Sequence, residues 1–362
     1  MSVTSQAAER PTRRRRWTAV AAAAGALWSV GYLALSLGWL AGVGANPADP
    51  AVDPAAELTL PGLLGPTAGA ALLTVLSVVG LAVAVASFRL QRRADGAARA
   101  VGWAAVVLGL VLAVGMPDYR VLAVLGYAPI VLVMALAGRL PGATLLDWPS
   151  LNLFLLTAAG LVFVAMGIAG LVVTYRTHGR PAWTAPAAVA RWGRWATGIA
   201  VAVPLGYAVT RYAWALGIPL GLSQESFADI REIAGIGAGL ATGGVVGALL
   251  TWGLTRPWGS RFPTWLPGLG GRAVPIPLAV VPASVVAVAV TSAGLMFVRV
   301  AVTGRLADYF PVGVEDIAGW LPEMFWPVWG VALGAATLAY VLRRTQVAAS
   351  ARQTPGRTSP LS

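Results

Sequence analysis

Long runs of apolar residues alternate with short polar segments along this chain. Most of the runs are 17–28 residues long, and about 20 residues suffice for a helix to cross roughly 30 Å of hydrocarbon. Crossing backbone must satisfy its own hydrogen bonds, so each run is expected to be helical. The pattern predicts an all-α fold, a polytopic transmembrane helical bundle. The eight predicted spans are 17–44, 68–87, 100–116, 151–175, 195–222, 234–255, 276–300 and 324–342.

Charge sorts the connections between these runs into two alternating kinds. One kind contains 20 of the 26 arginines with only Glu9 and Asp95 as acids, and the other contains the remaining 12 acids. Basic residues mark the cytoplasmic side of a membrane. We therefore expect a multi-pass protein of the cell (plasma) membrane with cytoplasmic N- and C-termini. The arginines of the inner kind are Arg10, Arg13–Arg16, Arg89, Arg92, Arg93, Arg99, Arg176, Arg180, Arg191, Arg194, Arg256, Arg261, Arg272, Arg343, Arg344, Arg352 and Arg357.

A ninth apolar run, Val121–Gly138, does not fit this alternation. Counting it as a span would place the basic loop between Arg176 and Arg194 outside, against the charge rule. Omitting it restores strict alternation, and the run then becomes an outer apolar or re-entrant segment kinked at Pro129. We interpret the chain as eight spans plus this segment. Nine spans, with one loop that violates the rule, is the alternative.

An internal repeat agrees with eight spans. A four-span unit returns to the side on which it began, so the chain would be a tandem 4+4 pair of parallel repeats. Chance similarity between Gly- and Trp-rich membrane sequences is the competing explanation. The matches are Gly31-Tyr32, Trp39 and Gly42 with Gly206-Tyr207, Trp214 and Gly217 at an offset of 175, Asp118-Tyr119 with Asp308-Tyr309, Trp148-Pro149 with Trp320-Leu321-Pro322, and Tyr175-Arg176 with Tyr340 through Arg344.

These observations predict four parts of the chain. A basic cytoplasmic tail covers residues 1–16, and the first four-span half covers 17–195 and includes the extra segment 121–138. The second four-span half covers 196–344. Residues 345–362 are rich in Ser, Thr, Arg and Pro, which predicts a disordered cytoplasmic tail.

Three segments carry a likeness to known sequences: 117–120 (PDYR), 211–219 (RYAWALGIP) and 329–334 (WGVALG). They resemble a group of uncharacterised polytopic membrane proteins of actinobacteria. The resemblance extends over most of the chain. It implies membership of that membrane-embedded group and brings no activity with it.

Composition argues against several classes of function. The chain has no cysteine, which excludes thiol catalysis and thiolate metal sites, and its one histidine, His178, lies in a basic inner loop. No HExxH motif and no nucleotide-binding loop is present. The net charge of +12 reflects topology and attraction to anionic lipid of the inner leaflet rather than nucleic acid. We expect no cofactor, no metal and no nucleic-acid partner, and an enzyme is the least favoured class.

Four glycines recur at every fourth residue of one predicted span: Gly235, Gly239, Gly243 and Gly247. On a helix they form one stripe, along which another backbone can approach closely. We interpret the stripe as helix packing within the monomer. A homodimer seam, contact with a membrane partner and a glycine-lined permeation path are the alternatives.

Arg211 is the most unusual charge in the chain. It follows Trp195 by 16 residues, which is ~24 Å along a helix. That depth is about 6 Å short of the outer edge of a roughly 30 Å core. A buried membrane arginine costs ~2.5–3.5 kcal/mol, so it is usually paired or functional. Alternatively, its stem extends to the interface beside Tyr212 and Trp214.

Three acids follow at helical spacing on the predicted outer side. Glu225, Asp229 and Glu232 would share one face of a helix and are the predicted partners of Arg211. Together they could form a vestibule for a cationic solute. A solvated outer helix face is the alternative.

Two outer turns occupy matching places in the proposed halves. Asp118 lies beside Arg120, and Asp308 lies near Arg305. Arg299, near the outer end of its span, is expected to pair with Asp308 or with one of the two acids at 315 and 316. If the halves pack about a pseudo-twofold axis, both turns would face one outer mouth; two unrelated loop turns are the alternative.

Two classes of function fit this sequence. The first is a small-solute permease or transporter-like protein, with its site between the two halves near Arg211. The second is a non-transporting membrane scaffold or accessory subunit that uses the glycine stripe and the cytoplasmic arginines as contacts. A transporter predicts a polar-lined cavity, whereas a scaffold predicts a closed core and an exposed glycine stripe.

Overall fold

A computed structural model describes residues 3–90, 93–138, 147–177, 179, 181–309 and 315–353. The described residues are helical apart from turns and one isolated β-bridge between Arg261 and Ala273. The all-α prediction is therefore confirmed. The chain divides into two compact units, Met1–Arg180 (unit 1) and Pro181–Ser362 (unit 2). The boundary in the sequence lies in the connection before the first long helix of unit 2.

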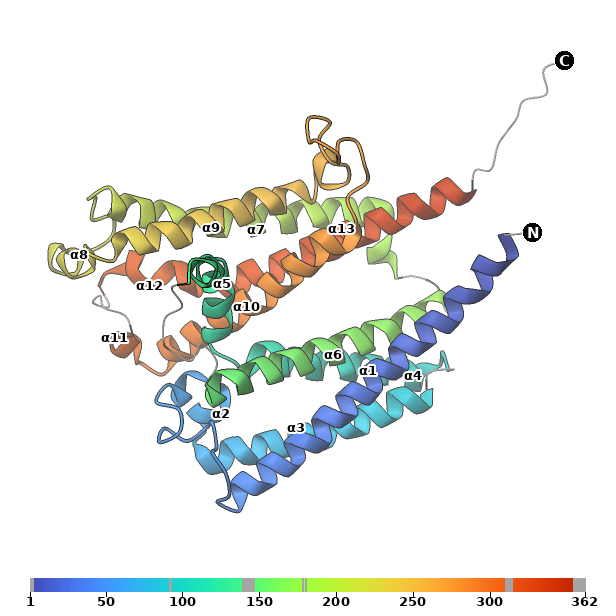
Figure 1. Cartoon of the computed structure of the whole chain (residues 1–362), viewed down its shortest axis with the longest axis horizontal. Coiled ribbons are helices and arrows are strands. Elements are labelled where there is room, and N and C mark those ends of the chain that lie inside the picture. The colour runs from blue at the N-terminus through green and yellow to red at the C-terminus, as the bar shows by residue number, and fades with distance from the viewer. Residues whose placement is uncertain are drawn as a thin grey trace. The chain divides into compact units, whose positions relative to one another are not determined.

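Unit 1 contains four long helical segments and, besides these, the 17-residue α5 and the four-residue α2 (blue to green in Figure 1). A π-helical turn, Val111–Gly115, extends α4, and a 3-10 turn, Ala56–Leu58, lies in the loop after α1. The helices are α1 (Val3–Leu40), α2 (Leu60–Leu63), α3 (Pro66–Leu90), α4 (Gly96–Leu110), α5 (Arg120–Leu136) and α6 (Trp148–Thr177).

Unit 2 also contains four long helices (yellow-green to red in Figure 1). Its shorter elements include the 3-10 turns Ala182–Thr184 and Pro257–Gly259. The helices are α7 (Pro186–Ala215), α8 (Gln224–Ile230), α9 (Ala234–Gly253), α10 (Ile276–Val302), α11 (Leu306–Tyr309), α12 (Ile317–Met324) and α13 (Trp326–Gln353).

Seven helical segments are long and apolar enough to cross a membrane, which supports a multi-pass membrane protein. The 30-residue α7 is long enough but is not in this set, and it carries Arg191, Arg194 and Arg211. The 17-residue α5, which covers the disputed run 121–138, is also outside the set. The seven segments are Trp17–Leu40, Pro66–Leu90, Gly96–Gly115, Trp148–Tyr175, Ala234–Gly253, Ile276–Val302 and Ile317–Val347.

Local sequence explains where several helices begin and end. Asp95 caps α4, because its carboxylate accepts a hydrogen bond from the Ala98 amide at 3.0 Å. The helices α1 and α7 finish in the same way, with Gly42 and Gly217 at positive φ. In both, the next amide bonds back to a carbonyl five residues earlier, which is the pattern of a Schellman cap. The two matched glycines therefore have the same structural role.

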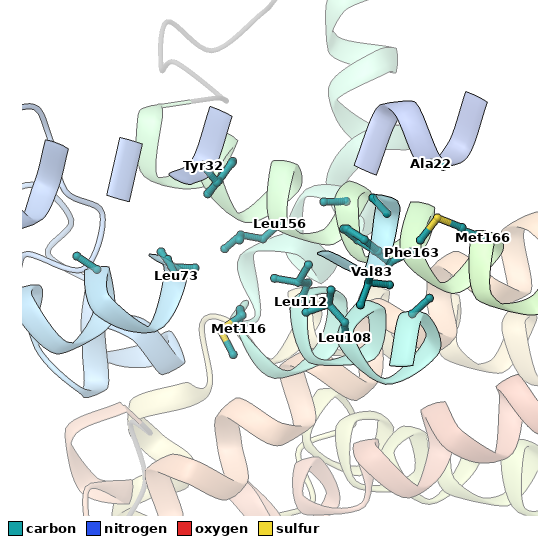
Figure 2. Close-up of a cluster of buried hydrophobic side chains, with 14 of the residues drawn as sticks. Ala22, Tyr32, Leu73, Val83, Leu108, Leu112, Met116, Leu156, Phe163 and Met166 are labelled. Carbon is teal, nitrogen blue, oxygen red and sulfur yellow. The ribbon is translucent and has the colours of Figure 1, made fainter. Parts of the chain in front are cut away.

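Helices α1, α3, α4 and α6 form a closed ring in unit 1, each packing on the next. Figure 2 shows the core between them, where Phe163, Leu112 and Leu156 are fully buried. Glycine pairs bring α4 and α6 together: a Cβ on Gly109 would lie 2.5 Å from the Gly160 carbonyl oxygen. A Cβ on Gly167 would lie 2.5 Å from the carbonyl oxygen of Gly102. These glycines permit close backbone packing.

Unit 2 uses a similar set of helix pairs but does not close in the same way. Helix α7 packs on α9 and α13, and α13 packs on α10, as α1 packs on α3 and α6, and α6 packs on α4. The seam that joins α3 to α4 has no counterpart of its size between α9 and α10, both of which are described throughout. The short α12 lies against α7, α10 and α13. Unit 2 is therefore more open than unit 1 beside α9.

The predicted tails lie partly within helices. Helix α1 begins at Val3, and α13 continues to Gln353, so each extends beyond the predicted span. The boundary expected at residue 195 falls inside α7. Both α6 and α13 begin with a Trp-Pro pair, Trp148-Pro149 and Trp326-Pro327, whereas Trp320 lies in α12.

Candidate functional site

Arg211 is buried in the last two turns of α7. Its guanidinium lies between two aromatic rings, 4.4 Å from the ring centroid of Tyr207 and 4.2 Å from that of Trp214. These residues precede and follow Arg211 by one helical turn, so one face of α7 supplies the whole cradle. Cation–π attraction to two rings offsets part of the cost of burying the charge. The side chain does not extend outward as an exposed stem would.

The ion-pair partner of Arg211 is Glu323 of α12. The second terminal nitrogen of the guanidinium donates to the Ala318 carbonyl and to the Thr210 hydroxyl, both at 3.1 Å. Two of these three bonds cross from α7 to α12, so the arginine ties the short helix to the long one. The predicted partners were the acids of α8, and the structure assigns this role to a different residue.

Glu323 lies one residue before the end of α12 and is buried. One carboxylate oxygen meets Arg211, while Oε2 is buried with no hydrogen-bond partner among the described residues. Phe325 forms a turn, and α13 begins at Trp326. The carboxylate is therefore at a break between two helices within one candidate span, Ile317–Val347. A buried acceptor without a partner is rare in proteins.

A buried donor lies in the same cluster. The indole nitrogen of Trp326 has no hydrogen-bond partner in the described part of the chain. Its ring packs edge-on against Tyr207, with centroids 5.8 Å apart, and against Phe297 at 5.4 Å. Tyr207 also contacts the guanidinium of Arg211. We call these residues the Glu323 site: Tyr207, Arg211, Trp214, Glu323 and Trp326.

The acids of the predicted vestibule lie elsewhere on unit 2. Glu225 and Asp229 are exposed on α8, and Glu232 is exposed in the turn that follows. Among the described residues, no group of three histidine, cysteine, aspartate or glutamate side chains could hold a metal ion. In this structure the three carboxylates form a solvent-accessible face and do not reach Arg211.

Asp316, at the start of α12, is nearly inaccessible. Its carboxylate accepts hydrogen bonds from the Ser223 amide at 2.5 Å and from the Ser226 hydroxyl. The Ala318 amide donates to the Gly221 carbonyl at 3.3 Å. These bonds fix the start of α12 against the start of α8. They explain how so short a helix holds Glu323 in place.

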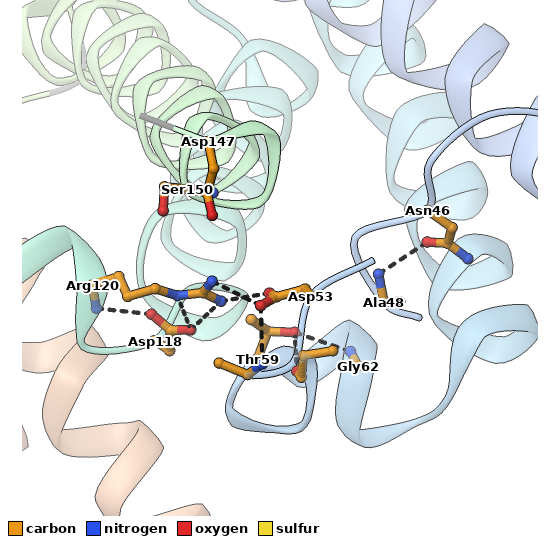
Figure 3. A network of polar contacts seen from close by, with 11 residues as sticks. Asn46, Ala48, Asp53, Thr59, Gly62, Asp118, Arg120, Asp147 and Ser150 are labelled. Atoms are coloured by element: carbon orange, nitrogen blue, oxygen red, sulfur yellow. Dashed lines mark hydrogen bonds and ion pairs between the residues drawn. The ribbon is translucent and has the colours of Figure 1, made fainter. Parts of the chain in front are cut away.

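Asp118 belongs to a polar cluster of unit 1, shown in Figure 3. Arg120 donates from Nε to Asp118 at 2.8 Å and from both terminal nitrogens to Asp53, at 3.0 and 2.8 Å. Burial by itself would lower the pKa of Arg120, but the hydrogen bonds and negative charges of Asp118 and Asp53 raise it above its ordinary value. The cluster joins the loop after α1 to the start of α5.

The matching turn of unit 2 is different. Asp308 pairs with Arg305 at 3.0 Å on an exposed turn, and Arg305 also lies over the ring of Tyr309. Arg299 is partly buried in the last turn of α10. Asp308, one of its three expected partners, pairs with Arg305. An exposed pair of this kind contributes little to stability.

The predicted glycine stripe lies on a face of α9 that no described residue of unit 2 covers. A Cβ added at Gly235, Gly239, Gly243 or Gly247 would meet no atom within 4 Å. The face that packs on α7 is offset from it: a Cβ added at Gly237 would lie 3.7 Å from the Arg211 side chain, and one added at Gly244 would lie 3.7 Å from Pro204. Buried alanines continue this second face at positions 234, 241 and 248.

A small cavity lies in unit 1 under the loop that contains Asp53. Its volume is about 10 Å³, enough for about one water molecule. Polar atoms of Asp53, Thr59 and Asn152 contribute to a lining that is otherwise apolar. This space is too small for a solute, so it is not the polar-lined cavity expected of a transporter.

No family model matches this chain, no curated protein matches it, and no solved structure matches its fold.

Neither Glu323 nor Trp326 of the Glu323 site, nor Asp53 of the Arg120 cluster, was predicted as a site residue from the sequence. Glu323 lies just outside the predicted eighth span, 324–342. A single carboxylate inside the apolar stretch Ile317–Val347 was the available signal. No sequence pattern pointed to Asp53 as the partner of Arg120, because the two residues are 67 positions apart in the sequence. His178 lies outside the described residues.

Proposed function

We propose that the protein is a multi-pass membrane transporter of permease type for a small polar solute. The solute would bind at the Glu323 site in unit 2. The observation that carries this proposal is the buried carboxylate oxygen of Glu323, which lacks a partner at the break between α12 and α13. Ionisable residues within spans are costly and commonly mark transport pathways.

Helix breaks support the same assignment. Discontinuous helices often form the binding sites of secondary transporters, because the freed backbone groups and nearby side chains can contact a solute. In unit 2 the break is at Phe325, three residues after Pro322, and Pro327 is the second residue of the next helix. The packing of α12 against α7, α10 and α13 places the break among three of the four long helices of its unit.

The chemistry of the Glu323 site indicates the class of solute. Glu323 Oε2 is an acceptor, so the solute must donate a hydrogen bond or carry a positive charge. Trp326 offers a buried indole N–H, so the solute also needs an acceptor. Small amino compounds, amides and polyols meet both conditions. A hydrophobic solute would leave both groups unsatisfied.

Uptake into proteoliposomes tests the proposal. The full chain would be reconstituted and screened with labelled amino acids, amines, amides and polyols, with empty vesicles as the background. Glu323→Gln keeps the size of the side chain but removes its charge. A hydrogen bond to a charged group contributes about 1.5–3 kcal/mol, so uptake is expected to fall at least about ten-fold.

A matched variant separates the site from general effects of lost charge. Asp308→Asn removes a carboxylate from the exposed pair with Arg305 and should leave uptake unchanged. Absence of uptake for every solute class, or equal uptake by Glu323→Gln and the parent protein, would refute the transport proposal.

A second function, assembly with another membrane helix, is favoured by the uncovered glycine stripe on α9. Glycines at every fourth residue support close helix pairing in membranes. Gly239→Leu should then abolish co-purification of a tagged and an untagged copy, or of a membrane partner, while the thermal stability of the isolated chain is unchanged. Unaltered assembly would count against this function.

We further propose that α7 is an eighth span, that both termini are cytoplasmic in the cell membrane, and that the units are tandem repeats of the actinobacterial membrane group. The charge sorting and the shared helix pairing support this. A reporter at Gly179 should be on the same side as the N-terminus for eight spans and on the opposite side if α5 also crosses. If the Gly179 reporter is on the same side as the N-terminus, a C-terminal reporter on the outside would contradict α7 as a span.

A further inference from the structure

The connection between α9 and α10 is an ordered loop, although it joins two candidate spans. The Phe262 amide donates to the Arg272 carbonyl at 2.9 Å, and the Val274 amide donates to the Ser260 carbonyl at 3.0 Å. The Gly271 amide donates a hydrogen bond to the Phe262 carbonyl at 2.9 Å. We call residues 255–275 the basic hairpin. Because it directly follows one span and precedes another, it lies at a membrane interface.

The basic hairpin carries three exposed arginines and no compensating acid. Arg256, Arg261 and Arg272 are exposed, and residues 233–307 contain no aspartate or glutamate. Within the described residues, none of these three guanidinium groups donates a hydrogen bond to the protein. Arg256 only stacks on Trp252, with 4.4 Å from its guanidinium carbon to the ring centroid. Their hydrogen-bond donors are therefore available to an external partner.

The nearby arginines of α13 are used differently. Arg343 donates to the Leu254 carbonyl at 2.6 Å, and Arg344 donates to the Val274 carbonyl at 2.9 Å. These two carbonyls lie at the two ends of the basic hairpin, so α13 anchors the loop from both sides. The hairpin thus presents its own arginines from a fixed base, which lowers the entropy lost when they bind.

Aromatic side chains accompany the three charges. Trp265 is 77% exposed and Trp252 is 45% exposed. Tryptophan rings favour the headgroup region of a bilayer, because the apolar part of the ring can contact lipid while the indole N–H is hydrated. Guanidinium groups pair well with phosphate oxygens, since their planar donors can form two parallel hydrogen bonds.

We propose that the basic hairpin binds the headgroups of anionic phospholipids in the adjoining leaflet. The partner is the phosphodiester of a bilayer lipid, held by Arg256, Arg261 and Arg272, with Trp265 inserted beside the acyl chains. This lipid site is separate from the Glu323 site and does not depend on transport.

Native mass spectrometry of the full chain tests the lipid site. The protein would be reconstituted with phosphatidylglycerol and phosphatidylcholine and extracted gently, and the bound lipids counted. The triple variant Arg256→Gln/Arg261→Gln/Arg272→Gln should lose the preference for phosphatidylglycerol, by about five-fold for each arginine removed. A triple lysine variant should retain much of the preference, because it keeps the charge.

Two controls make the result decisive. Arg305→Gln removes one arginine charge from the turn after α10, outside the basic hairpin, and should leave the lipid preference unchanged. Excess inorganic phosphate should not displace the bound phosphatidylglycerol. An unchanged preference in the triple glutamine variant, its loss in Arg305→Gln alone, or displacement by inorganic phosphate would each overturn the proposal.

Discussion

In unit 1 Arg120 lies between two carboxylates, whereas in unit 2 Arg211 lies between two aromatic rings and reaches one carboxylate. The cluster around Arg120 joins loops, and each of its carboxylates accepts at least one further backbone hydrogen bond. The Glu323 site joins α7 to α12, which lies inside a candidate span, and leaves one carboxylate oxygen without a partner among the described residues. Complete satisfaction is typical of a structural cluster, and an unsatisfied acceptor is typical of a functional one.

The two units also use glycine differently. In unit 1 Gly102, Gly109, Gly160 and Gly167 lie at the seam between α4 and α6, where no side chain would fit. In unit 2 the most regular glycine stripe lies on the open side of α9. Regular spacing therefore does not identify the packed face. The surrounding helices decide which glycines are needed for close packing.

The largest expected effect is that of Glu323→Ala, which tests whether Arg211 depends on a single carboxylate. The substitution leaves a buried arginine without its counter-charge, so the free energy of unfolding should fall by about 3–5 kcal/mol. Thermal unfolding in detergent measures this. Asp118→Ala is the matched change in unit 1, and it should cost less because Asp53 still pairs with Arg120. Equal losses in both variants would contradict the contrast between the clusters.

The next largest effect concerns the glycine seam of unit 1. Gly160→Leu forces a side chain between α4 and α6, and overpacking of this kind typically costs about 1–3 kcal/mol of unfolding free energy. Gly239→Leu is the matched change in unit 2 and should alter the unfolding free energy by less than about 0.5 kcal/mol, as for an open surface site. If Gly239→Leu were the more destabilising in the isolated chain, the open face of α9 would be misassigned.

The smallest effect compares the starts of α6 and α13, which both begin with Trp-Pro. Asp147 caps α6 by accepting from the Ser150 amide at 2.9 Å, whereas no comparable side-chain cap is described before Trp326. Asp147→Ala should lower the unfolding free energy by about 1 kcal/mol. Chemical denaturation measures this free energy, and Phe325→Ala, just before α13, is the control at a helix start without a described side-chain cap. If both variants lost the same unfolding free energy, the result would argue against a cap by Asp147.

The same cap gives a pH dependence. The side-chain and backbone hydrogen bonds of Ser150 hold the pKa of Asp147 below its ordinary value. A carboxylate with a depressed pKa in the folded state stabilises the fold above its unfolded pKa and loses that contribution as pH falls through the folded pKa. Unfolding of the parent and of Asp147→Ala should therefore converge below about pH 4. A constant difference at acid pH would contradict this.

Much of the fold was predictable from local pattern. The predicted span 234–255 corresponds to α9 (Ala234–Gly253), and 276–300 corresponds to α10 (Ile276–Val302). A long apolar run in a membrane forms a helix because its backbone groups must hydrogen-bond to one another. Seven of the helical segments are suited to crossing. The matches Gly42 and Gly217 also had a local cause, the positive φ of a helix cap.

The candidate site was less predictable. Arg211 is buried and paired, which was one of the two expectations for it, but Glu225, Asp229 and Glu232 are not its partners. They were chosen because they follow it closely in the sequence, whereas Glu323 is 112 residues away. Glu323 is brought into place only by the packing of α12 on α7 and by the bonds that fix Asp316 to the serines of α8.

The sequence by itself determined the helical class and most helix positions. Both properties follow from the length of each apolar run and from the need of its backbone to form hydrogen bonds within the same segment. They can therefore be predicted from residues that are close together in the sequence. Only the tertiary structure decided that Arg211 pairs with Glu323, that Asp53 pairs with Arg120, and that Gly160 rather than Gly239 lies at a tight seam within a unit. Each depends on which distant helix is adjacent, because charge pairing and close packing act over a few ångströms in space and not along the chain.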